Sequence, residues 1–196
     1  MTIRSGLAAA VLTVAVVLAG CSGPKFYVEV SGLKDAQAPE KRSYVLRPGT
    51  KAVDPDDLQF KEFATYANRA LQDRGYLPAR EGAAEVVIFL SYGVGDPKTT
   101  YYSAGLRGAF HTRTDFFRWA SLEAVDADVY AKTQKVVQLW RTTMLSDGAS
   151  GDLRIIFPIL IAAGQPYLAA NTGQQVLKVL TDDSPEVLAI RGEPKL

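Results

Sequence analysis

The sequence has one cysteine and one histidine among its 196 residues, which restricts the chemistry that needs several of either. A single thiol, Cys21, cannot form a disulfide within the chain. The two residues together also fall short of the ligands that a zinc site normally needs. His111 lies in a polar stretch four residues before Asp115, and as a general base it would need a nucleophile and an orienting partner. We therefore expect no metal site and no catalytic residue, with single-histidine catalysis as an open alternative.

An excess of charge of one sign is also lacking. Lysine and arginine number 22, and aspartate and glutamate number 21. Proteins that bind nucleic acid usually carry a strongly basic face, so no nucleic-acid partner is expected. Beyond the first twenty residues, no apolar run reaches the length that crosses a bilayer. What remains is long enough to bury the core of one ordinary domain.

The first twenty residues have the layout of a secretory signal peptide. Arg4 provides the positive start, and the apolar run from Leu7 to Ala19 follows it. This run is too short to span a bilayer as a stable helix. Small residues come before the cysteine, as a signal peptidase requires. We expect this segment to be removed.

The segment Leu18-Ala19-Gly20-Cys21 resembles the lipobox of bacterial lipoproteins. The resemblance implies that diacylglycerol is joined to the Cys21 thiol, that the chain is cut before this residue and that the new amine is acylated. These acyl chains are the only non-protein groups expected, and no free thiol then remains for catalysis. The predicted organisation is a signal peptide at 1–20, a lipidated cysteine with a short tether at 21–25, and one domain at 26–196. An uncleaved anchor, or an ordinary signal peptide with a chance cysteine, is the alternative.

Ser22 bears on which membrane holds the protein. In the enterobacterial sorting pattern that this segment resembles, Asp after the cysteine favours the inner membrane, and Ser allows export to the outer one. The expected location is the periplasmic face of the outer membrane. Each buried methylene contributes about 0.8 kcal/mol, so several acyl chains hold a protein far better than one.

The first half of the domain alternates strand and helix patterns. Asp54 and Pro55 are typical of a helix start, and Arg74-Gly75 of a helix end. Between them Phe60, Phe63, Ala67, Ala70 and Leu71 recur at helical spacing and predict one buried face. The continuous apolar run at 86–90 predicts a central strand that is covered on both faces. Strands are also expected at 26–30 and 43–46, with a loop at 31–42.

The second half predicts a long hairpin and a buried helix. Its arms are 116–130 and 136–145, and Trp119 and Trp140 are expected to meet on one face. A second helix should open at Ser150-Gly151-Asp152, with a kink or restart at Pro158. Apart from Pro158, every residue of 155–163 is apolar, which predicts a helix buried on all sides. The remaining expectations are a stop at 171–173, a strand at 175–180 and a short terminal element at 185–190. The fold class is α+β, a mostly antiparallel sheet packed against two main helices in one domain.

Several motifs together resemble a family of proteobacterial envelope lipoproteins, catalogued as a domain of unknown function (number four-one-three-six). They are Phe89-Leu90-Ser91-Tyr92-Gly93-Val94-Gly95-Asp96-Pro97, Gly151-Asp152-Leu153-Arg154, Phe157-Pro158, Tyr167, Asn171-Thr172-Gly173-Gln174 and the lipobox. The stretch after Asp96-Pro97 is shorter here than in the relatives with this pattern. The resemblance implies an α+β domain with a mostly antiparallel sheet, and no activity.

Other polar motifs have simple structural explanations. Gly93-Val94-Gly95 lacks the third glycine and the Lys-Ser/Thr pair of a phosphate loop, so a turn is expected. The acidic residues at 54–57 lack the spacing of a calcium loop and are explained by helix capping. Asp126 with Asp128, and Asp182-Asp183, are expected to be exposed. A glycosidase-like carboxylate pair is kept as an alternative, because separation in space cannot be read from sequence.

Aromatic residues gather in the glycine-containing stretch at 92–111, which is expected to be a ragged hairpin or a mobile loop. Tyr92, Tyr101, Tyr102 and Phe110 are predicted to bind a partner, because such rings are frequent at recognition surfaces. It is also possible to explain these rings as a cover for the sheet. The predicted function is a membrane-anchored, non-enzymatic binding or accessory module for another envelope component, namely a protein, peptidoglycan or lipid. A carrier of a small apolar ligand between sheet and helices is the second hypothesis, and a carboxylate-based hydrolase is the third.

Overall fold

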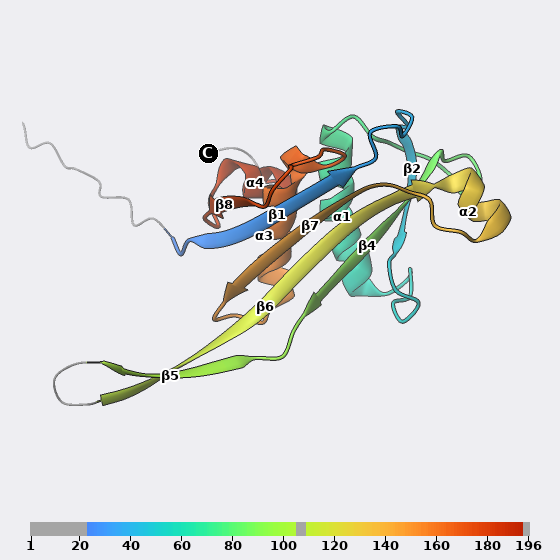
Figure 1. The fold of residues 1–196 in the computed structure, drawn as a ribbon. Helices are drawn as coiled ribbons and strands as arrows, with labels where there is room; N and C mark the ends of the chain where they lie inside the picture. The colour runs from blue at the N-terminus through green and yellow to red at the C-terminus, as the bar shows by residue number, and fades with distance from the viewer. Residues whose placement is uncertain (1–22, 105–108, 194–196) are drawn as a thin grey trace, which may run out of the picture.

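The computed structural model describes residues 23–104 and 109–193 (Figure 1). The predicted signal peptide at 1–20, the lipidation site at Cys21 and the sorting residue Ser22 lie outside these residues. The described part is one α+β domain, and its first element is a strand that begins at Phe26.

An eight-stranded, mostly antiparallel sheet forms the centre of the domain. The strands follow the order β3-β2-β4-β6-β7-β1-β8, and β5 pairs only with β6. The pairs of β2 with β3 and with β4 are parallel, and the others are antiparallel. The strands are β1 (Phe26–Lys34), β2 (Ser43–Pro48), β3 (Leu77–Pro78), β4 (Val86–Val94), β5 (Lys98–Ala104), β6 (Ala109–Asp126), β7 (Gln138–Gly148) and β8 (Val176–Leu180).

Three helices cover one face of this sheet, and a fourth lies at its end (Figure 1). The apolar run at 86–90 lies inside the sheet as predicted, between β2 and β6, although β6 occupies the middle. The core fills the space between sheet and helices. At its centre the rings of Phe63 and Phe157 stack with centroids 4.0 Å apart. The helices are α1 (Leu58–Asp73), α2 (Ala127–Thr133), α3 (Leu153–Gly164) and α4 (Pro185–Arg191), with a 3₁₀ helix at Gln165–Tyr167.

Helix α1 confirms the predicted buried face but not the predicted start. The five apolar residues expected to face the core are the five that the structure buries. The cap is Asp57 and not Asp54, since the Asp57 carboxylate accepts a hydrogen bond from the Phe60 N–H at 2.9 Å. Asp54 forms the preceding turn and accepts from the Asp56 N–H. Asp54 therefore stabilises a local turn and does not cap the helix, which begins three residues later than expected.

Helix α3 is buried as predicted, but it neither restarts at Pro158 nor extends to residue 171. Residues 156–164 are all buried, and the helix runs through Pro158 without a break. The proline removes the hydrogen bond to the Arg154 carbonyl, and Arg154 is an exposed residue of the first turn where water has access. The helix ends at Gly164 because residues 165–167 tighten into the 3₁₀ turn that contains Pro166.

The segment after this turn crosses the sheet beside β1. The Thr172 N–H donates to the Gly32 carbonyl at 3.0 Å, and the Gly32 N–H donates to the Thr172 hydroxyl at 3.1 Å. A Cβ on Gly32 would lie 2.6 Å from the Ala170 carbonyl oxygen, so only glycine fits this crossing. Strand β1, which contains Gly32, extends to Lys34, further than the predicted end at residue 30.

The predicted long hairpin is present as β6 and β7, but the two tryptophans do not meet. Trp119 lies opposite Leu145, and Trp140 lies opposite Ala124. Because side chains alternate along β6, positions 119 and 124 point to opposite faces of the sheet. The predicted first arm is too long, because β6 ends at Asp126 and residues 127–133 form α2. Asp126 is the N-cap of this helix and accepts a hydrogen bond from the Val129 N–H at 3.1 Å.

Candidate functional site

The most distinctive surface is a two-stranded ribbon that projects from the sheet (Figure 1). It consists of β5 and the start of β6, with register from Lys98 opposite Asp115 to Ala104 opposite Ala109. The stretch expected as a ragged hairpin or a loop is therefore a regular hairpin up to these residues. We call residues 98–103 and 110–115 the aromatic ribbon. The connection at 105–108 lies outside the described residues and is not part of it.

The start of the ribbon follows from local sequence. Strand β4 ends at Val94, and the Gly95 N–H donates to the Phe117 carbonyl at 2.8 Å. Pro97 has no N–H to donate, so pairing is interrupted at this point. The chain resumes at Lys98 as a partner of β6 alone.

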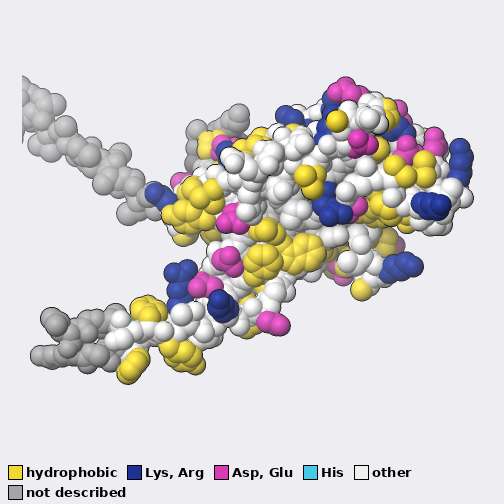
Figure 2. Space-filling model, in the orientation of Figure 1, with side chains coloured by type: hydrophobic (Ala, Val, Ile, Leu, Met, Phe, Trp, Pro, Cys, Tyr) yellow, Lys and Arg dark blue, Asp and Glu magenta, His cyan; other side chains and the backbone are white. Residues whose placement is uncertain are grey.

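The ribbon holds large aromatic side chains in water. Phe110 is 82% exposed, Tyr101 is 73% exposed and Tyr102 is 48% exposed. Tyr102 stacks on His111 across the strand pair, with ring centroids 5.6 Å apart. Apolar groups can be seen along the projecting ribbon in Figure 2. Solvent-exposed rings without a core to cover are the feature expected of a recognition surface.

The two faces of the ribbon differ in character. The register places Tyr101 with Thr112, and Ser103 with Phe110, on a face without charges. The threonine pair at its base, Thr99 and Thr114, shares a hydrogen bond of 2.9 Å. The opposite face carries the pairs Lys98–Asp115, Thr100–Arg113 and Tyr102–His111, and Arg113 forms a salt bridge of 2.8 Å with Asp115.

Tyr92 is separated from the other three predicted anchors. Its ring lies edge-on against Phe63 and Phe157, at centroid distances of 4.8 and 5.7 Å. Burial raises the pKa of the Tyr92 hydroxyl above its ordinary value. The structure brings Tyr101, Tyr102 and Phe110 onto the aromatic ribbon, whereas Tyr92 packs over the core.

A buried arginine at the base of the ribbon was not singled out from the sequence. Arg118 is 2% exposed and donates to the Ser150 carbonyl at 2.8 Å and to the Ser146 hydroxyl at 2.9 Å. No salt bridge to it is formed within the described residues, and desolvation lowers the pKa of its guanidinium. It ties the loop before α3 to β6 where the ribbon leaves the sheet. Its sequence context, a charged residue in a strand pattern, resembles that of any exposed arginine.

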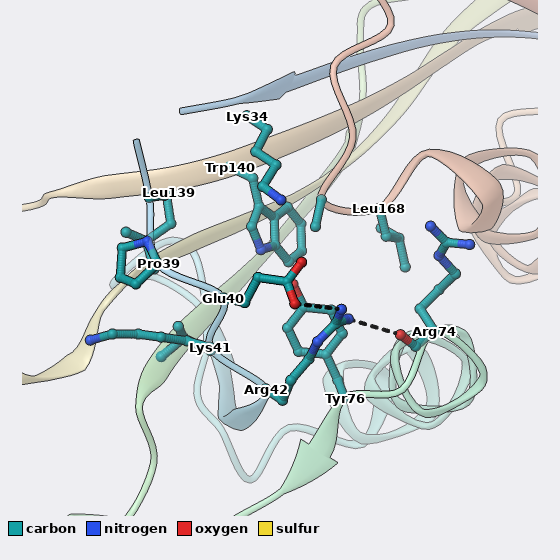
Figure 3. A pocket seen from close by; sticks show the side chains of 13 residues that line it. Lys34, Pro39, Glu40, Lys41, Arg42, Arg74, Tyr76, Leu139, Trp140 and Leu168 are labelled. Atoms are coloured by element: carbon teal, nitrogen blue, oxygen red, sulfur yellow. Dashed lines mark hydrogen bonds and ion pairs between the residues drawn. The ribbon is translucent and has the colours of Figure 1, made fainter. Parts of the chain in front are cut away.

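A small cavity of about 210 Å³ lies at the opposite end of the domain, between the loop after β1 and the end of α1 (Figure 3). Tyr76 and Trp140 form its floor in a contact of 5.9 Å between centroids. Arg42 lies over the Tyr76 ring at 5.4 Å and donates to the Arg74 carbonyl at 3.2 Å. Ligand pockets for small molecules usually measure about 300–1,000 Å³, so this cavity is small for a carrier.

A ligand carrier and a carboxylate-based hydrolase both find little geometric support. An open groove of about 530 Å³ beside Pro48, Val53 and Phe89 has the volume of a ligand pocket, but α3, the helix expected to border a carrier's ligand site, lines neither this groove nor the cavity at Tyr76 and Trp140. Two shallow grooves each contain two carboxylates, Glu29 with Asp147 and Glu81 with Asp128. In each pair one member is already engaged, since Glu29 accepts from Gln175 and Glu81 pairs with Arg47.

Metal-ligating side chains are scattered over residues 23–104 and 109–193, and no group of three or more lies together there. None of the helices in this part of the chain has the length and apolar character needed to cross a membrane.

Comparison with known proteins gives only loose structural likeness. No protein-family model matches the chain, and no curated protein matches it. A PDZ domain protein from Parabacteroides distasonis aligns with a TM-score of 0.46 and 9% identity, over 82% of this chain and 40% of that one. The PelC dodecamer from Paraburkholderia phytofirmans aligns with a TM-score of 0.40 and 18% identity, over 74% of this chain and 99% of that one. Likeness at this level carries no argument about function, and the resemblance to the lipoprotein family stays a prediction.

Proposed function

We propose that this protein is a lipid-anchored, non-enzymatic binding module of the cell envelope, located on the periplasmic face of the outer membrane. Its lipid anchor is Cys21, and its recognition element is the aromatic ribbon. The observation that carries the proposal is the exposure of Tyr101, Tyr102 and Phe110 on a projecting element. The partner is another envelope component, which the experiment below sorts into protein, peptidoglycan or lipid.

The form of the ribbon supports binding over a role in folding. Tyr offers a large contact area with only two rotatable bonds and a polar tip, so little side-chain entropy is lost when it binds. Strand β6 connects the ribbon to the sheet, because it pairs with β5 in the ribbon and with β4 and β7 in the sheet. A rigid base with exposed rings is the arrangement expected of a preorganised recognition element.

The double variant Tyr101→Ala/Tyr102→Ala separates binding from folding. Rings that cover a core cost about 3 kcal/mol or more when truncated, whereas exposed rings cost much less. We expect thermal unfolding of the lipidated variant to stay close to that of wild type. Crosslinks from intact envelopes to proteins, to peptidoglycan or to photoactivatable lipids should be lost.

A matched control is Leu58→Ala, because Leu58 is 82% exposed at the start of α1, away from the ribbon. It should change neither the unfolding temperature nor the crosslinks. A large fall in the melting temperature of the tyrosine variant, or an unchanged crosslink pattern, would show that the ribbon is not the recognition element.

A further inference from the structure

We propose that the distal part of the aromatic ribbon, residues 101–103 and 110–112, contacts the surface of the bilayer that holds the acyl chains of Cys21. The partner class is therefore lipid, at the level of the headgroups. This inference rests on the proposed lipid anchor and names the partner of the same surface.

The sheet register relates the height of the ribbon to the start of the domain. Strand β1 pairs with β7, and β7 pairs with β6, and these registers place Phe26 level with Phe116. Phe110 lies six residues beyond Phe116 along β6, which corresponds to about 20 Å at about 3.3 Å per residue. Figure 1 shows that β1 begins at the end of the molecule from which the ribbon projects.

The tether can reach no further than the ribbon projects. Cys21 precedes Phe26 by five residues, and a fully extended chain of this length spans at most about 18 Å. The acylated cysteine therefore lies no further from the level of Phe26 than Phe110 does. A bilayer that holds Cys21 on this side of the domain is therefore within reach of the ribbon. A longer tether would allow the domain to stand further from the bilayer than the ribbon can reach.

The chemistry of the ribbon is graded along its length. Tyr101, Tyr102 and Phe110 lie in the distal part, and aromatic residues of this kind are frequent at the boundary between membrane and water. The charged side chains Lys98, Arg113 and Asp115 lie at the base. Arg113 is paired with Asp115, whereas Lys98 forms no salt bridge within the described residues and is suited to lipid phosphates, to which basic side chains near a membrane are attracted.

The depth of contact is limited by the backbone. Within the described residues β5 pairs only with β6, and residues 110–115 of β6 pair only with β5, so both edges of the ribbon have unpaired N–H and C=O groups. Such groups are not tolerated in the hydrocarbon core, where no water can satisfy them. The ribbon should therefore rest among the headgroups and not cross the membrane.

A spin label measures this contact directly. Cys21 is the only native cysteine, and the proposed lipid occupies its thiol, so an introduced cysteine is the only free one. The lipidated full chain would carry a nitroxide at Tyr101→Cys or at Phe110→Cys, in vesicles of phosphatidylethanolamine and phosphatidylglycerol. The matched control is Val136→Cys, which is 56% exposed and follows α2 at the other end of the sheet.

Labels on the ribbon should collide several-fold less with a water-soluble nickel chelate than the control label does, and more with oxygen, which partitions into lipid. Ribbon labels that are as accessible to nickel as the control would overturn the inference. Protection from nickel without a gain in oxygen collisions would also overturn it, because the ribbon would then be covered by protein.

The mass of the N-terminal peptide from the same vesicles separates the two proposals. An acylated protein with water-exposed ribbon labels overturns the membrane contact alone and leaves the proposed binding function standing. An unmodified Cys21 overturns the lipid anchor, and this inference with it.

Discussion

The carboxylate of Asp126 has two structural partners at the end of β6. It lies 2.8 Å from the Lys41 ammonium group, and the two side chains are only 16% and 19% exposed. It also accepts the Val129 N–H as the cap of α2. The hydrogen bond from Lys41 and then that from Val129 lower the pKa of Asp126 below its ordinary value. This residue, predicted to be an exposed acid, therefore joins the loop before β2 to the sheet.

Asp126→Asn tests this role. A lowered folded-state pKa means that the carboxylate stabilises the fold above its unfolded pKa of about 3.9, and that this contribution is lost as pH falls through the folded value. The amide oxygen still caps α2, whereas the charge that attracts Lys41 is gone. We expect the free energy of unfolding in urea to fall by about 1 kcal/mol near neutral pH, with the difference closing in acid.

The control for this variant is Asp128→Asn, on an exposed side chain of the same helix. It should change stability much less at either pH. An equal loss for Asp126→Asn in acid and at neutral pH would show that the cap, and not the ion pair, carries the effect.

The sequence does not predict which individual aromatic side chains are buried and which are exposed. Tyr92, Tyr101 and Tyr102 share a residue type and a strand-like context, yet one packs on Phe63 and the others face water. The difference depends on what lies across the sheet. Tyr92 lies on a strand that α1 and α3 cover, whereas β5 extends past both helices. Long-range placement of this kind is not encoded in a local pattern.

At the scale of single elements, periodicity predicted burial better than it predicted ends. The apolar face of α1 follows from helical spacing alone, since burial of that stripe is the main stabilisation of the helix. The ends depend on competition between local turns. Asp54 and Asp57 are both good caps, but Asp54 is engaged in the turn that precedes the helix, and Asp57 is the residue that caps it.

Helix α3 offers the sharpest test of an element. Leu160 is fully buried, so Leu160→Asp places an unpaired carboxylate in the core and should cost several kcal/mol. Ile155→Asp adds the same charge to the same helix at a position that is 48% exposed, and should cost far less. Thermal unfolding of both variants checks this. Equal melting temperatures for both variants and wild type would mean that α3 is not core.

The order of strands in the whole molecule could not be read from the sequence. Strand β1 pairs with β7 and β8, which come from the second half of the chain. Strand β2 pairs in parallel with β4, although helix α1 lies between these two strands in the sequence. Patterns identify most of these elements but not their neighbours. The projection of the ribbon depends on this order, because β4 and β7 end their pairing with β6 near residues 116–118 while β6 continues.

The last prediction concerns how the whole molecule is held. Mass spectrometry of the membrane-bound protein should show a chain that begins at Cys21 and carries acyl chains on it. The apolar run at 7–19 is too short for a stable span, whereas acyl chains contribute about 0.8 kcal/mol per methylene and hold the domain at the surface. Cys21→Ser should remove the acyl mass, and Ser22→Ala, which keeps the thiol, should retain it. A membrane-bound protein that still contains residues 1–20, or that begins elsewhere with Cys21 unmodified, would contradict the anchor.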